Sequence, residues 1–184
     1  KEYRRQRQMC IRDRFYFDRL TLNAGVRLED IDGEVLNRNT GVTTYNDQKE
    51  VMPSISLLFP LSNNLNLIAG IHQGFSPSGP GATGIDPESS TNYEFGGRYN
   101  NQNTYAELFG FYSDYSNLLG RCRVSDFGCD PGQVFSGGEV TINGLEVFGE
   151  QTFEISQSST LKIGLTYTYT CLLYTSDAAD DTPC

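Results

Sequence analysis

Long hydrophobic runs are missing from this chain of 184 residues. No stretch approaches the roughly 18 consecutive apolar residues that a transmembrane helix requires. The hydrophobic fraction is 38% and the mean hydropathy is −0.42, which does not favour an ordinary helical or α/β core. A membrane location is still open, because strands of a membrane barrel alternate lipid-facing and lumen-facing residues and have low average hydropathy.

Basic residues and histidine are also scarce. Fourteen Lys and Arg stand against 23 Asp and Glu, which gives a formal net charge of −9. A nucleic-acid partner is therefore not expected, because phosphate binding needs a basic surface. The single histidine, His72, has no nucleophile placed near it by the sequence, so no catalytic triad is indicated. We expect no enzyme and no cofactor.

The two ends lack the pattern of the middle. Residues 1–14 (KEYRRQRQMCIRDR) hold six of the fourteen basic residues, and residues 171–184 (CLLYTSDAADDTPC) end on a cysteine. Both resemble translated sequencing-adapter tracts, with MCIRDR and CLLYTSDAADD as the diagnostic strings. We therefore interpret both ends as non-native and leave them out of the fold prediction. Native basic and acidic tails are the alternative.

Few cysteines remain once the ends are set aside. Cys122 and Cys129 lie seven residues apart in a loop, where a small disulfide is possible in an oxidising compartment. A metal site is not expected, because no second Cys or His cluster completes a zinc site and no EF-hand spacing surrounds the acidic loop residues.

What is present favours strands. Glycine (19), Tyr (11) and Phe (11) are abundant, and apolar and polar residues alternate with period two. The clearest case is 161–169, where Leu161, Ile163 and Leu165 alternate with Lys162 and Gly164. We predict an all-β chain of about seven strands, at 15–29, 51–60, 64–75, 92–100, 104–116, 144–155 and 161–169.

The connections alternate in length. Tight polar turns are predicted at 60–64, 100–103 and 156–159, and long loops rich in Gly, Pro, Ser, Asn and Asp at about 30–50, 76–91 and 117–140. An outer-membrane β-barrel has this order, with short periplasmic turns and long extracellular loops. A soluble β-sheet with one wet face fits the periodicity but does not explain the alternation of turns.

A barrel predicts which face each residue takes. The apolar face would meet lipid, with Tyr93, Tyr99, Tyr167 and Tyr169 near strand ends as aromatic girdles. The polar face would line the lumen, and its charged members are Glu94, Arg98, Glu146, Glu150 and Lys162. Glu94 and Arg98 share this face and are candidates for an ion pair. Because bacterial single-chain barrels have an even number of strands, seven strands indicate an internal fragment that does not close on itself.

Four stretches between residues 52 and 146 resemble TonB-dependent receptors. MPSISLLFPLSNNLNLIAGIHQGFSPSGPG contains a "GF-P" element, and ESSTNYEFGGRY, after Pro87, resembles "PE-S-NYE-G-RY". YAELFGFYSDYSN resembles an "FY-DY-N" strand, and GGEVTINGLE resembles a "GG—GLE" strand. The elements look most similar to ferric citrate-type receptors, and the resemblance covers about residues 15–170. Gly96 and Gly97 are interpreted as positions where neighbouring backbone or a plug approaches closely.

The resemblance implies a receptor in the outer membrane of a Gram-negative bacterium. A ferric chelate, ferric citrate or another siderophore, would bind extracellular loops and be released inward when the TonB complex displaces a plug. Outer-membrane lipid and lipopolysaccharide would surround the barrel. The plug and the TonB box are not in this sequence.

The candidate ligand residues lie in the loops. Arg121 and Arg123 flank Cys122, and an arginine fork suits the oxygens of an anionic chelate. Gln73 and Phe75 are second candidates by position, and an ordinary solvated loop is the alternative for all four. Two other functions remain open: a passive porin or adhesive barrel, and a soluble carbohydrate-binding β-domain. The sequence does not identify the chelate or the oligomeric state.

Overall fold

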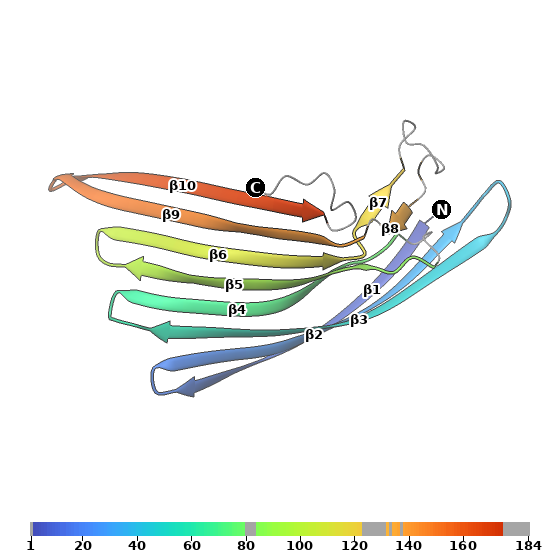
Figure 1. The fold of residues 1–184 in the computed structure, drawn as a ribbon, viewed down its shortest axis with the longest axis horizontal. Helices are drawn as coiled ribbons and strands as arrows, with labels where there is room; N and C mark the ends of the chain where they lie inside the picture. The colour runs from blue at the N-terminus through green and yellow to red at the C-terminus, as the bar shows by residue number, and fades with distance from the viewer. Residues whose placement is uncertain (1, 80–83, 123–131, 133, 137, 175–184) are drawn as a thin grey trace.

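The computed structural model describes residues 2–79, 84–122, 132, 134–136 and 138–174. Eight long antiparallel strands form one continuous sheet in the order β1-β2-β3-β4-β5-β6-β9-β10, and a short hairpin forms a second sheet. Apart from that hairpin, every strand pairs with its neighbour in sequence, as Figure 1 shows. The strands are β1 (Glu2–Phe17), β2 (Leu20–Leu36), β3 (Thr43–Pro60), β4 (Leu65–Ser76), β5 (Glu88–Asn100), β6 (Thr104–Ser116), β7 (Leu119–Arg121), β8 (Val134–Ser136), β9 (Val140–Ser156) and β10 (Ser159–Tyr174).

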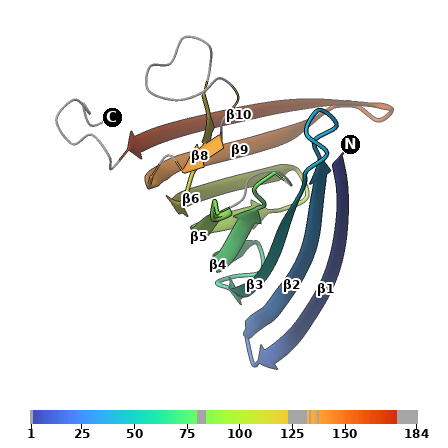
Figure 2. The same ribbon diagram turned by 90° about the vertical axis from the view of Figure 1, so that its right-hand side faces the viewer.

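The prediction of an all-β, open antiparallel sheet is confirmed. β1 and β10 form the two edges and do not pair with each other. The sheet is curved and twisted, as the view along its side in Figure 2 shows, in keeping with the right-handed twist of strands. No helix in the described ranges is long and apolar enough to cross a membrane.

All the connections at one end of the sheet are tight. They lie at residues 18–19, 61–64, 101–103 and 157–158, and we call this the turn end. The three predicted turns are confirmed. At 101–103, the Asn101 side-chain oxygen accepts hydrogen bonds from the backbone N–H groups of Asn103 (2.9 Å) and Thr104 (2.7 Å). Such a local side-chain bond offers the backbone an alternative to the ladder and therefore ends the strand.

The fourth tight turn was not predicted. The expected strand at 15–29 is divided by Asp18 and Arg19, and Asp18 has a positive φ of 50°. The apolar alternation continues on both sides of this turn, with Phe15 opposite Leu22 and Phe17 opposite Leu20. Because the apolar residues change from odd to even positions between Phe17 and Leu20, the sequence did carry a signal for the reversal. The division adds β1, which contains residues 2–14, and raises the strand count to eight.

The opposite end of the sheet, which we call the loop end, carries residues 37–42, 77–87 and 117–139. The loop predicted at 30–50 is wrong in its extent, since β2 continues to Leu36 and β3 begins at Thr43. Here the face that was apolar in the first half of β2 becomes charged, with Asp30 opposite Lys49 and Asp32 opposite Asp47, while Ile31 on the other face is buried opposite Gln48, so the apolar alternation of the first half does not continue. The hairpin turn is held by Asn37, which accepts the backbone N–H of Gly41 at 2.8 Å.

The register gives the sheet two different faces. Ile71, Tyr93 and Tyr112 align across three strands on what we call the apolar face, and Ala69, Phe95 and Gly110 align beside them. The polar face contains the alternate residues, including Asn92, Glu94 and Arg98 in β5. Large apolar side chains such as Phe95 (64% exposed) and Leu165 (67% exposed) have no protein packed over them in the described chain.

The aromatic girdle is confirmed only in part. Tyr93 and Tyr112 pack edge to face with ring centroids 6.0 Å apart toward the loop end, and Tyr99 lies near the turn end. Six residues separate Tyr93 and Tyr99, or roughly 20 Å along a strand. Tyr167 and Tyr169 do not lie at a strand end, because β10 continues to Tyr174.

Candidate ligand-binding and polar-face sites

The five charged residues predicted to share a face do lie on the polar face. In register, Arg98 is opposite Glu107, while Glu146 and Glu150 occupy alternate positions of β9. Lys162 of β10 reaches Glu150 with its Nζ 3.2 Å from Oε1. The suggested pair of Glu94 and Arg98 is wrong, because Arg98 bonds Glu107 of the neighbouring strand instead.

Arg98 is the centre of a bonded cluster near the turn end. Its Nε donates to Glu107 Oε1 at 2.5 Å, and the Tyr105 hydroxyl donates to the same carboxylate oxygen. A residue directly opposite on the next strand is closer than one four positions away on the same strand. For this reason the register of β5 against β6, and not the spacing within β5, selects the partner of Arg98.

Removing one member of this cluster is expected to have a modest effect. We expect Glu107→Gln to lower the free energy of unfolding by about 1 kcal/mol or less, because the Arg98 side chain is 43% exposed and water screens the pair. Urea unfolding of the intact receptor measures it. Lys162→Gln, which removes the more exposed Glu150 pair, should change stability still less. A larger loss in Lys162→Gln than in Glu107→Gln would contradict this ranking.

Aromatic side chains on the polar face cover two glycines. An added Cβ at Gly96 would lie 2.5 Å from Cδ1 of Phe109, and one at Gly144 would lie 2.5 Å from Cζ of Phe111. The predicted close approach is therefore confirmed for Gly96. It is wrong for Gly97, where a Cβ would meet nothing nearer than 3.6 Å. The two glycines differ because Gly96 faces the rings and Gly97 faces the apolar side.

Gln73 and Phe75, the second ligand candidates, lie beyond the Tyr93–Tyr112 pair toward the loop end. They have the same parity as Ile71 and so belong to the apolar side of the sheet, not to the polar face. Both line a cavity of about 290 Å³ together with residues of β3, β5 and β6. The sequence singled them out by position, and the structure places them in one cavity.

Of the two arginine candidates, Arg121 lies among the described residues. Arg121 is the last residue of β7, which pairs with β8 through Arg121 and Val134. Cys122 is buried, at 3% exposed, and disulfide-bonded. Arg123 and Cys129 lie outside the described residues, so the predicted pairing of Cys122 with Cys129 stays a prediction.

A contact that the sequence did not predict fixes the start of the β4–β5 loop. Ser78 is 3% exposed and lies against the β2–β3 hairpin, 30 residues earlier in the chain. The Asn46 side-chain amide donates to Ser78 Oγ at 3.0 Å and to the Gly79 carbonyl at 2.9 Å. The Gln48 amide also donates to Ser78 Oγ. We call these four residues the loop clasp. No local pattern marks it, because a serine in a loop is expected to be solvated.

Ser78→Ala is expected to loosen this loop. The change removes the Oγ acceptor that Asn46 and Gln48 share, while the backbone carbonyls of Gly79 and Ser78 remain as acceptors, so the local loss is about 0.5–1.5 kcal/mol, the usual net value of a hydrogen bond. We expect faster amide hydrogen exchange at residues 76–79 and earlier protease cleavage of this loop in the intact receptor. Ser76→Ala is the control, since Ser76 is exposed. Equal exchange in both variants would show that the clasp does not hold the loop.

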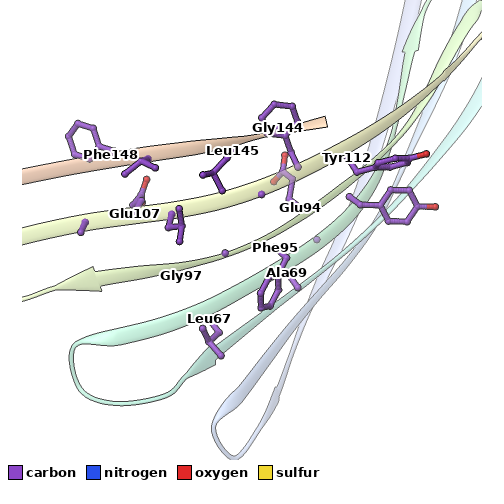
Figure 3. A pocket seen from close by; sticks show the side chains of 18 of the residues that line it. Leu67, Ala69, Glu94, Phe95, Gly97, Glu107, Tyr112, Gly144, Leu145 and Phe148 are labelled. Atoms are coloured by element: carbon purple, nitrogen blue, oxygen red, sulfur yellow. The ribbon is translucent and has the colours of Figure 1, made fainter. Parts of the chain in front are cut away.

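The apolar face carries a shallow hollow of about 1380 Å³ that extends from β3 to β10. Figure 3 shows part of it, with Leu67 and Ala69 of β4 near Phe95 of β5, and Leu145 of β9 farther across the sheet. Gly97, Gly110 and Gly149 lie on this face and line the hollow. Because glycine has no side chain, the surface is recessed at these positions. Within the described ranges, no group of three or more His, Cys, Asp or Glu side chains is placed to hold a metal ion.

Known proteins share this architecture. A family model described as "TonB dependent receptor-like, beta-barrel" matches residues 2–183. The ferrichrome outer membrane transporter/phage receptor of Escherichia coli K12 is 24% identical over 179 residues, which are 94% of this chain and 23% of that protein.

Solved structures agree on the fold. The ferric citrate transporter FecA in its unliganded form has a TM-score of 0.74 at 17% identity, over 96% of this chain and 27% of that one. The alcaligin outer membrane receptor FauA of Bordetella pertussis has a TM-score of 0.70 at 18% identity, over 100% and 32%. The FrpB iron transporter of Neisseria meningitidis has a TM-score of 0.71 at 16% identity, over 93% and 27%. The chain thus spans about a quarter to a third of the length of these relatives. It belongs to the TonB-dependent receptor-like β-barrel family, and it is a piece of an outer-membrane barrel wall.

Proposed function

We propose that this chain is part of a receptor that takes up a ferric chelate across the outer membrane, with energy supplied by the TonB complex. The observation that carries the proposal is the open eight-stranded wall with tight turns at one end and loops at the other, joined to the match over residues 2–183. Relatives named for ferrichrome, ferric citrate and alcaligin support an iron chelate as the substrate class.

The orientation of the sheet in the membrane is inferred from the family. The turn end would face the periplasm and the loop end the outside, as in outer-membrane barrels generally. The polar face would line the lumen, so that Arg98, Glu107, Glu146, Glu150 and Lys162 stay hydrated or paired. The same charges on the lipid side would cost several kcal/mol each in the middle of the bilayer.

Ligand recognition is proposed for the loop end. Arg121 and Arg123 supply paired donors that fit carboxylate or hydroxamate oxygens of an anionic chelate. The Arg121→Ala/Arg123→Ala double variant should weaken uptake of such a chelate by about tenfold, equivalent to the loss of roughly 1.4 kcal/mol. Lys49→Ala is the control, because this exposed cation lies on the neighbouring hairpin. Unchanged uptake in the double variant would show that the two arginines do not bind the ligand.

The whole proposal is tested with the unbroken gene around residues 15–170. Deleting that gene should abolish growth of its host on one of three iron sources: ferrichrome, ferric citrate or alcaligin. Deleting the gene for TonB should have the same effect on that source. Uptake that persists without TonB would point to a passive porin. A segment 15–170 that is monodisperse in buffer without detergent would point to a soluble domain. The same gene sequence tests the proposal that residues 1–14 and 171–184 are non-native.

A further inference from the structure

Strands β3 and β4 separate before they end. Their ladder stops at the pair Ser54 and His72, although β3 extends outward to Thr43 and β4 to Ser76. β4 keeps its pairing with β5 as far as Ser76, and β3 keeps its pairing with β2, whose hairpin extends beyond the other strands (Figure 1). The wall is therefore interrupted between β3 and β4 while the strands on either side of them stay paired.

The cavity of about 290 Å³ lies at this interruption and reaches both sides of the sheet. Among its lining residues, Glu50 and Met52 belong to the polar face, whereas Val51 and Phe75 belong to the opposite side. Since β4–β5 and β5–β6 are fully paired here, a cavity crosses the sheet only between β3 and β4. The cavity is thus an opening through the wall, and most of its lining residues are polar.

Beyond the opening, the two strands meet again in the same register. Gln48 and Ser78 lie six residues outward from the last ladder pair, one on each strand, and they are hydrogen-bonded in the loop clasp. The interruption therefore has the same length on both sides, namely residues 49–53 and residues 73–77, which we call the seam. Because the lengths are equal, the strands can close on each other without a shift in register.

The backbone groups that face the seam belong to odd-numbered residues. At the turn end of the same strand pair, the Leu61 N–H donates to the Leu65 carbonyl at 2.8 Å. Backbone groups of successive residues point to alternate sides of a strand, so the odd-numbered residues of β3 and β4 direct theirs toward the other strand. Pro53 and Pro77 occupy two of these positions, and proline has no N–H to donate. The ladder thus lacks one donor at each end of the seam.

A closed seam is only weakly held for this reason. The facing pairs that share backbone bonds in a closed seam are Pro53–Gln73, Val51–Phe75 and Lys49–Pro77. Each proline removes one donor, so these three pairs can form four hydrogen bonds instead of six. Closure brings Val51 against the Phe75 ring, which is a favourable cross-strand pair. It also takes water away from the Glu50 carboxylate, which opposes closure. The open and closed forms are therefore close in free energy.

We propose that the seam is a two-state gate in the barrel wall. In the open form, which this structure has, a hydrated side opening joins the polar face to the outer side at the loop end. In the closed form the ladder continues outward to the loop clasp, which keeps the two strands in register. The seam lies outside the Tyr93–Tyr112 pair, beyond the hydrocarbon level, where water reaches unpaired backbone groups. The gate does not depend on which solute the receptor takes up.

Disulfide cross-linking in the intact receptor detects the closed form. Glu50 and Ser76 face each other across the seam without sharing backbone bonds, so closure brings their Cα atoms to about 4.5 Å, within the disulfide range of roughly 4.4–6.8 Å. We expect Glu50→Cys/Ser76→Cys to oxidise slowly with copper phenanthroline. The matched control is Ser56→Cys/Gly70→Cys, because a Cβ at Gly70 would lie 3.7 Å from Cβ of Ser56. This control should oxidise about tenfold faster.

Replacing both prolines of the seam should favour the closed form. Pro53→Val/Pro77→Val restores two donors, so the cysteine pair across the seam should oxidise about tenfold faster than with the prolines present. Pro60→Val is the control, since Pro60 is even-numbered and directs its nitrogen away from β4. Ser78→Ala should slow the oxidation, because it weakens the loop clasp. Heat-modifiable gel mobility checks that each variant is folded.

Amide hydrogen exchange at single residues detects the open form without cysteines. The Val51 and Phe75 amides face the seam, whereas those of Met52 and Gly74 face β2 and β5, with which they are paired. We expect the first two amides to exchange at least about tenfold faster than the other two, and to slow in the proline double variant.

Two results would each overturn the gate. Equal exchange at all four amides would show that the seam is not open, and unchanged oxidation after both prolines are replaced would show that it does not close. No iron chelate enters these measurements. Growth on the three iron sources therefore tests the proposed function separately.

Discussion

Phe95→Lys is expected to keep the intact receptor out of the outer membrane, while Glu94→Lys, one residue earlier, leaves assembly nearly unchanged. Phe95 is 64% exposed on the apolar face of β5, four strands away from the edge strand β1 and three away from the edge strand β10. A lysine at the bilayer midplane costs about 2–4 kcal/mol. Glu94 lies on the polar face, where a lysine head group stays hydrated. The two variants thus carry the same new side chain on opposite faces of one strand.

Both variants are measured by the amount of receptor in the outer-membrane fraction and by its mobility on unboiled gels. Urea unfolding in liposomes then gives the stability difference for any Phe95→Lys protein that folds. Equal losses in the two variants would contradict the assignment of faces. A loss in Glu94→Lys alone would reverse it.

Gly96→Ala is expected to destabilise the barrel strongly, and Gly97→Ala to have little effect. A Cβ at Gly96 would meet the Leu108 carbonyl oxygen and the Phe109 ring at once. The carbonyl oxygen belongs to the backbone and cannot move away as a flexible side chain does. We therefore expect the overpacking to lower the free energy of unfolding by about 1–3 kcal/mol or more. The adjacent Gly97 has room for a Cβ, since its nearest neighbour would be 3.6 Å away.

A second glycine pair repeats the experiment on another strand. Gly144→Ala would bring a Cβ against the Tyr169 carbonyl oxygen and the Phe111 ring, whereas Gly149→Ala meets nothing within 4 Å. Urea midpoints of the four variants should therefore fall into two groups, with Gly96→Ala and Gly144→Ala unfolding earlier. If Gly149→Ala unfolds as early as Gly144→Ala, the loss comes from replacing glycine by alanine in a strand, whatever its surroundings, and not from the contact with the ring.

Much of the fold was predictable because a β-meander is built from local signals. Period-two alternation assigns Leu145 and Glu146 to opposite faces without any knowledge of the neighbouring strand. Tight turns such as 101–103 depend on side chains one to three residues away. The extent of the β2–β3 hairpin was not predictable, because the face that is apolar at Val26 and Leu28 becomes charged at Asp30 and Asp32, so the period-two pattern stops before the strand does.

The candidate sites were less predictable. Gln73 and Phe75 were chosen by position, but their place on the apolar side depends on parity relative to Ile71, which the sequence does contain. Their association with Asp114 and Ser116 depends on the registers of two strand pairs and could not be inferred from spacing. The loop clasp joins Ser78 to Gln48 across 30 residues, and nothing in the sequence around either residue predicts the contact.

The sequence by itself determined that this protein is a strand meander with one apolar and one polar face, because alternation and turn chemistry act over a few residues. The sequence also indicated the family, through short sequence elements that follow one another in a fixed order. Only the tertiary structure decided that Arg98 pairs with Glu107, that Gly96 and not Gly97 lies under a ring, and that β3 and β4 separate around a cavity. Each of these depends on which residue of the next strand lies opposite, and register is set by the sheet as a whole.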